Sequence, residues 1–317
     1  MNIRKPSARA IAGLALFAAL LAAPLAAQLL DNAHLLTVAT KMTVMAIAAV
    51  GLSLVLGLGG LVSLGHAAYL GVGAYAVGIL AHHGYASGWM QLAVAMAACT
   101  GFSLVIGALS LRTRGVYFIM VTLAFAQMLY FVGVGLAPYG GDDGLTISSR
   151  SGFGPWLPLE NPYVFHVVCV ALLAGVAAAI HAIGRSPFGL VLMASASNER
   201  RVRAIGYQVY RYQLVAYVVS GMVCGLAGVL LANLNNFVSP SMMHWTRSAE
   251  LVIMMILGGT ATALGPLFGA AALIALEEFL SSQTHYWQAA LGVLLLVAMR
   301  LARGGIDGLL AGGSHGR

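Results

Sequence analysis

The chain has 317 residues, of which 60% are hydrophobic and only 8% are charged. Soluble domains carry about 25% charged residues, so this composition excludes a soluble globular protein. A helix that crosses a bilayer needs about 20 apolar residues, and the apolar content therefore allows about nine or ten such helices. Too few residues remain for a second domain. We expect residues 1–317 to form a single all-α membrane domain, a polytopic helical bundle.

Ten apolar runs follow one another along the chain and predict about ten transmembrane helices, some of them broken or short. They cover residues 10–30, 36–56, 64–82, 89–111, 115–137, 163–184, 212–232, 248–258, 266–280 and 286–302. The first run is about twice as long as the core of a signal peptide, which favours an uncleaved span over a cleaved leader. The stretch Leu251–Leu257 is too short to cross alone, so a broken or re-entrant helix is expected there.

Basic residues divide unevenly between the two sides of the predicted bundle. If both termini are cytoplasmic, 13 of the 16 lysines and arginines lie on the cytoplasmic side, and only Lys41, Arg150 and Arg247 do not. Cytoplasmic loops of membrane proteins carry such an excess of Lys and Arg. The sequence thus predicts cytoplasmic N and C termini in the cell inner membrane. The net charge of +7 is then explained by orientation, and nucleic acid is not an expected partner.

Two predicted loops are unusually long. Residues 138–162, on the extracytoplasmic side, contain Gly140, Gly141 and Gly144 around Asp142 and Asp143, which is the chemistry of turns. Residues 185–211, on the cytoplasmic side, contain the densest charge in the chain. We therefore expect an extracytoplasmic cap on one face and a functional segment on the other.

A short helix of about two turns is predicted within the second loop, from Ser197 to Gly206. Ser197 is a good N-cap, Glu199 places a carboxylate in the first turn, and Gly206 can adopt the left-handed closing conformation. Val202 and Ile205 would give this helix one apolar edge. Such a short helix needs tertiary or partner contacts to persist. The plainer alternative is a solvated loop whose charges only set the topology.

Several stretches together carry a family resemblance. The longest begins at Ser186 and reads SPFGLVLMASASNERRVRAIGYQVYRYQLVAYVVSGMVCGLAGVL. Others are GLGGLVSLGHAAYLGVGAYAVGIL from Gly57, RTRGVYFIMVTLAFAQM from Arg112, GGDDGL from Gly140, LGGTATALGPLFGAA from Leu257, and ARGGIDGLL in the tail. The chain resembles the permease subunits of branched-chain amino acid ABC importers, and the M-type subunit in particular.

The resemblance implies that the short cytoplasmic helix docks in a groove of an ATPase. The ATPase-coupling residues would be Ser197, Asn198, Glu199, Arg200, Arg201, Val202, Arg203, Ile205 and Gly206. It also implies an H-type permease chain forming a heterodimer, two cytoplasmic ATP-binding subunits and a periplasmic substrate-binding protein. The solutes would be leucine, isoleucine or valine, although related permeases carry urea, short amides or other amino acids.

The sequence predicts that ATP is bound by partner subunits and that this chain binds no cofactor and is not an enzyme. A phosphate-binding loop ends in Gly-Lys followed by Ser or Thr, and the two lysines, Lys5 and Lys41, lie in no such context. Cys99, Cys169 and Cys224 lie separately in apolar runs, which indicates neither a metal site nor a disulfide framework. An ion-coupled secondary transporter is the rival class, but no charged residue lies at the centre of a confident span.

Two glycine clusters interrupt predicted spans on the cytoplasmic side. Broken helices expose backbone groups that can hold a polar solute, so they are candidates for the translocation pathway, with plain hinges or turns as the alternative. The pathway candidates are Gly59, Ser63, Gly65, His66, Gly258 and Gly259. A neutral, hydrogen-bonded His66 is favoured over a proton relay. The pairs Gly221 with Gly225 and Gly265 with Gly269 have the spacing of close helix contacts.

Overall fold

The computed structural model describes residues 8–147, 150–154, 158–259, 264–284, 286–301 and 305–310. Six of the described helices are long and apolar enough to cross a bilayer: α1 (Ala8–Leu29), α2 (Ala33–Ser53), α4 (Gly88–Ser110), α5 (Val116–Gly135), α6 (Pro162–Arg185) and α8 (Val209–Asn235). A π-helical turn, Leu54–Leu58, continues α2. The predicted helical membrane bundle is therefore confirmed.

The remaining described elements are shorter. They are the helices α3 (His66–His82), α7 (Pro187–Ala204), α9 (Trp245–Gly258), α10 (Gly265–Gln283), α11 (Trp287–Leu301) and α12 (Gly305–Leu310), the 3-10 turns η2 (Ala137–Tyr139) and η3 (Pro240–Met243), and the strands β1 (Leu145–Thr146) and β2 (Phe237–Val238). Each of the ten predicted apolar runs lies on a helix. The run expected to be broken is α9, which ends at Gly258.

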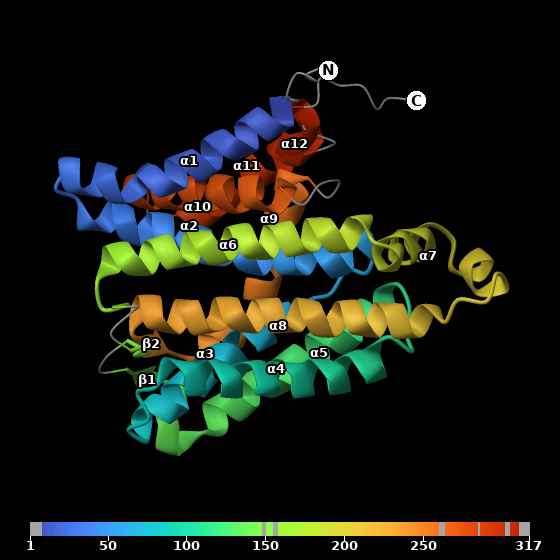
Figure 1. Cartoon of the computed structure of the whole chain (residues 1–317), viewed down its shortest axis with the longest axis horizontal. Coiled ribbons are helices and arrows are strands. Elements are labelled where there is room, and N and C mark those ends of the chain that lie inside the picture. The colour runs from blue at the N-terminus through green and yellow to red at the C-terminus, as the bar shows by residue number, and fades with distance from the viewer. Residues whose placement is uncertain are drawn as a thin grey trace.

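The long helices lie side by side, as Figure 1 shows for α1, α2, α6, α8 and α4. The helix α7 projects from one end of this bundle, and the β1–β2 ribbon lies at the opposite end (Figure 1). Burial separates the helices into a centre and a periphery: 72% of the span Ala33–Leu58 and 56% of α8 are buried, against 28% of α4, α5 and α6. The centre is built from α2, α3 and α8, and the outer helices expose apolar side chains where lipid would lie.

Glycines allow the central helices to approach closely. A Cβ on Gly73 of α3 would collide with the carbonyl of Gly225 on α8, and a Cβ on Gly228 would collide with the carbonyl of Leu70. Gly221 and Gly225 also face Ser103 and Cys99 of α4. Their predicted role in helix packing is confirmed, because only a residue without a side chain fits these contacts.

The long loop that precedes α6 is tied to the end of α8. Leu145 and Thr146 pair antiparallel with Val238 and Phe237. The guanidinium of Arg150 donates to the carbonyls of Asn233, Leu159 and Glu160 and lies 4.9 Å from the ring centroid of Phe165. This arginine, an exception to the predicted charge distribution, therefore holds the loop in place.

Candidate functional site

The charged segment between α6 and α8 is helical over most of its length. Ser186 caps α7 by accepting a hydrogen bond from the Gly189 amide, and Pro187 occupies the first turn. The helix is interrupted at Asn198, whose backbone is extended (φ −156°, ψ 91°) and whose side chain accepts from the Arg201 amide at 3.0 Å. The prediction that Ser197 begins a separate helix was wrong: Asn198 is the cap, and a first helical part precedes it. Both residue types cap well, so the sequence alone did not decide between them.

The second part of α7 forms an exposed, basic tip. Arg200, Arg201 and Arg203 are exposed there. Val202 is only 5% exposed whereas Ile205 is 69% exposed, so the predicted apolar edge of these two residues is wrong. Val202 belongs to the packing of this chain, and Ile205 is available to a partner. Gly206 follows with a φ of +94°, the left-handed conformation that was predicted.

Glu199 connects the tip to the rest of the chain. Its side chain is 18% exposed and pairs with Arg114 at 2.8 Å and also with Arg203 of the next turn. Arg114 lies in the connection between α4 and α5, far away in the sequence. The carboxylate is therefore engaged within the chain, and the free charge of the tip is positive. Sequence reasoning missed Arg114, since nothing local links the two residues.

The first part of α7 packs beside a break in the central helices. A cluster of three buried residues joins Leu192 of α7 to Leu54, at the end of α2, and to Ala216 of α8. Each of the three is at most 1% exposed. Leu54 begins the π-helical turn that ends α2. One turn further along α7, Ala196 lies against Gly60, where an added Cβ would be 3.0 Å from the alanine Cβ. A displacement of α7 would thus be felt directly at residues 54–60.

A buried polar cluster follows this break, at the start of α3. His66, fully buried, contacts the Ser63 hydroxyl through Nδ1 at 3.0 Å and the Ser220 hydroxyl through Nε2 at 2.9 Å. Because Ser220 donates its own proton to the Gly51 carbonyl at 2.8 Å, it must accept from Nε2. The imidazole therefore carries a proton on Nε2, and each ring nitrogen has a hydroxyl partner.

The same cluster joins several helices. Ala67 donates its amide to the Ser248 hydroxyl of α9 at 2.9 Å, which satisfies a buried donor at the start of α3. The Leu64 amide donates to Thr122 of α5 at 3.3 Å, and the hydroxyl of Tyr69 donates to that of Tyr217 on α8 at 3.1 Å. The cluster fixes the position at which α3 begins.

The structure brings together only some of the predicted pathway residues. Ser63, Gly65 and His66 lie in one buried cluster, and Gly59 lies in the preceding break. The nearest atoms to Gly258 belong to Gly265 and Gly269, which makes that cluster a close contact of α9 with α10. A role of these six residues in solute passage stays a prediction. Among the described residues, no group of three His, Cys, Asp or Glu side chains is placed to hold a metal.

Comparisons with known proteins agree on one family. Residues 34–299 match the model of the family described as "Branched-chain amino acid transport system / permease component". The chain is 28% identical over 287 residues to the high-affinity branched-chain amino acid transport system permease protein LivM of Escherichia coli, covering 83% of this chain and 67% of that protein, and the Salmonella typhimurium LivM matches equally. An autoinducer 2 import system permease protein, LsrC of Photorhabdus laumondii, is 29% identical over 93 residues, 28% of each chain. No solved structure matches.

The match spans the broken central helices and α7 together. A permease whose described residues include six helices able to cross a bilayer is a multi-pass protein of the cell inner membrane, and its family is one of transporters, not of enzymes. The chain belongs to the family of permease components of branched-chain amino acid transport systems.

Proposed function

We propose that this chain is the M-type permease subunit of an ABC importer for branched-chain amino acids. It would pair with an H-type permease, receive its solute from a periplasmic binding protein, and be driven by two ATPase subunits that bind the ATP. The permeases named LivM, which it resembles over most of its length, support this solute class. The chain itself would hold no cofactor.

The proposed orientation places α7 and both termini in the cytoplasm. The basic tip of α7 supports it, because Lys and Arg accumulate in cytoplasmic segments. In this orientation the ten apolar runs act as ten crossings, and the shorter helices α3, α9, α10 and α11 complete the bundle. The loop 138–162 and the β1–β2 ribbon then face the periplasm.

The observation that carries the proposal is that α7 has an exposed basic tip at one end and packs into the bundle at the other. Its tip exposes three arginines and Ile205 to a partner, while Leu192 and Ala196 pack against the break between α2 and α3. ATP-driven closure of the ATPases would move α7, and α7 would move residues 54–60 and the His66 cluster behind them. Such a lever gives alternating access without a charged residue at the centre of the membrane.

The proposal is tested with the chain reconstituted in vesicles together with its permease, ATPase and binding-protein partners. We expect ATP-dependent uptake of leucine, and we expect Arg201→Glu to abolish most of it while the complex hydrolyses ATP without transport, because the reversed charge faces the ATPase. Arg112→Glu, at another exposed arginine of the same end, is the control. Leucine uptake driven by an ion gradient without any ATPase would refute the importer in favour of a secondary transporter.

A further inference from the structure

A pocket of about 200 Å³ lies at the end of the bundle opposite α7, between α2, the end of α8, η3 and the start of α9. Its lining residues are Lys41, Met45, Leu70, Leu231, Asn235, Phe237, Ser239, Ser241, Met242, Arg247 and Leu251. A single water needs only about 10–15 Å³ of such space, and drug-sized ligands occupy pockets of about 300 Å³ or more. The volume suits a solute of the size of an amino acid.

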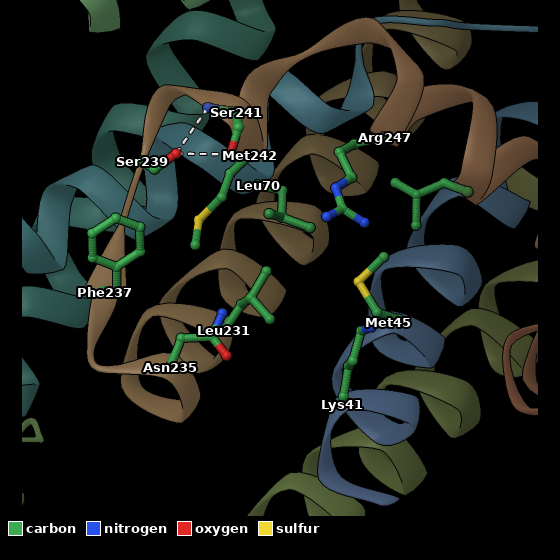
Figure 2. A pocket seen from close by; sticks show the side chains of 11 residues that line it. Lys41, Met45, Leu70, Leu231, Asn235, Phe237, Ser239, Ser241, Met242 and Arg247 are labelled. Atoms are coloured by element: carbon green, nitrogen blue, oxygen red, sulfur yellow. Dashed lines mark hydrogen bonds between the residues drawn. The ribbon is translucent and has the colours of Figure 1, made fainter. Parts of the chain in front are cut away.

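Two basic residues that do not follow the predicted excess of positive charge on the cytoplasmic side line this pocket. Of the three basic residues outside the predicted cytoplasmic set, Arg150 is used by carbonyl groups of its loop. The other two, Lys41 and Arg247, both line this pocket. Figure 2 shows their side chains extending toward one another, with Leu231 and Asn235 on the opposite side.

Each of the two cations has an ion-pair partner outside the pocket lining. Arg247 pairs with Glu250 at 2.8 Å and Lys41 with Glu277 at 3.6 Å, but neither glutamate lines the cavity, and no acidic residue is among the described residues of the lining. All four side chains are at least 26% exposed, and ion pairs that are accessible to solvent contribute little to stability. Both cations can therefore turn toward an anionic ligand at little cost.

The remaining lining residues are of two chemical kinds, polar and apolar. Ser239 and Ser241 supply two hydroxyl groups, which form a hydrogen bond with one another at 2.7 Å (Figure 2). The floor consists of buried aliphatic side chains, among them Met45, Leu70 and Leu251, which are at most 5% exposed. A carboxylate at the cations and an aliphatic side chain on the floor would both be accommodated, as pockets for small ligands combine apolar walls with few polar groups.

We infer that this pocket is a binding site for the carboxylate of an aliphatic amino acid, occupied before the solute reaches the buried break. Arg247 and Lys41 bind the carboxylate, and Met45, Leu70 and Leu251 contact the side chain. The inference rests on the proposed function for the nature of the solute. It adds a site within this chain, at the periplasmic end, to the function proposed above.

The test measures binding of radiolabelled leucine to the purified permease–ATPase complex without the binding protein. We expect saturable binding that unlabelled leucine and 4-methylpentanoate displace and leucinamide does not. Arg247→Met and Lys41→Met should each weaken it by about ten- to hundredfold, the value of a hydrogen bond to a charged group. Arg247→Lys should retain most of the affinity, since it keeps the charge.

The matched controls are Glu250→Gln and Glu277→Gln, which break the same two ion pairs without changing the lining. If the cations have only a structural role, these variants should lose leucine binding as Arg247→Met does. If the cations bind a carboxylate, leucine binding should be unchanged or tighter. The inference is overturned if the controls match the cation variants, if leucinamide competes equally, if only anionic phospholipid displaces the label, or if the wild type shows no saturable binding at millimolar leucine. ATP-driven uptake by that same wild type would leave the importer function standing.

Discussion

Replacing Leu192 by alanine should separate ATP hydrolysis from transport. The side chain is fully buried against Leu54 and Ala216, in a cluster small enough to relax partly. Leu→Ala changes at buried sites cost about 2–5 kcal/mol, and we take the lower half of that range here. A loss of about 2.8 kcal/mol raises the population in which α7 is detached from Leu54 about a hundredfold. Movement of α7 would then no longer be transmitted to the bundle, because α7 could move without moving the end of α2.

Two measurements check this expectation. Hydrogen exchange of the α7 amides should accelerate, and the number of ATP molecules hydrolysed per leucine taken up should rise severalfold. Leu190→Ala is the matched control, since Leu190 is on the same helix but 58% exposed. If Leu192→Ala left both the exchange and the ATP-to-leucine ratio at the values of the Leu190 variant, the packing of α7 on Leu54 would not be the coupling contact.

Two further perturbations address the centre of the bundle. Gly73→Ala should lower the melting temperature of the complex, because its Cβ would collide with the Gly225 backbone, while Gly101→Ala, which meets nothing within 4 Å, should be neutral or stabilising. Ser220→Ala should destabilise the protein by about 1–3 kcal/mol in thermal unfolding, because it leaves Nε2 of His66 without its acceptor. An unchanged melting temperature for Gly73→Ala, or for Ser220→Ala, would contradict the contact concerned.

The helices of this chain were predictable because the bilayer imposes their length. Every apolar run found in the sequence lies on a helix of the structure, and the run that was recognised as too short to cross alone lies on the 14-residue helix α9. The sequence did not predict which helices lie at the centre of the bundle and which lie at its periphery. Since lipid-facing and protein-facing sides are both apolar in a membrane, composition did not distinguish the buried α2 from the peripheral α4.

The site was predictable only where the signals are local. The basic segment and the closing Gly206 follow from neighbouring residues, and the family resemblance gave the segment its expected role. The pairing of Glu199 with Arg114 and the meeting of Lys41 with Arg247 depend on tertiary structure, so no spacing rule reveals them. The predicted apolar edge of Val202 and Ile205 was wrong because α7 ends at Ala204, so Ile205 is the C-cap and does not share the buried face of Val202.

The β1–β2 ribbon connects the loop that precedes α6 to the pocket proposed above, at the end of the bundle opposite α7. Leu145 is paired with Val238 and Thr146 with Phe237, while the Ile147 amide donates to the Asn236 carbonyl at 2.9 Å. Phe237 also lines the proposed amino acid pocket. A binding protein that docks on this loop would therefore displace Phe237 through main-chain hydrogen bonds. Docking would then open the proposed pocket at the moment when the solute is delivered.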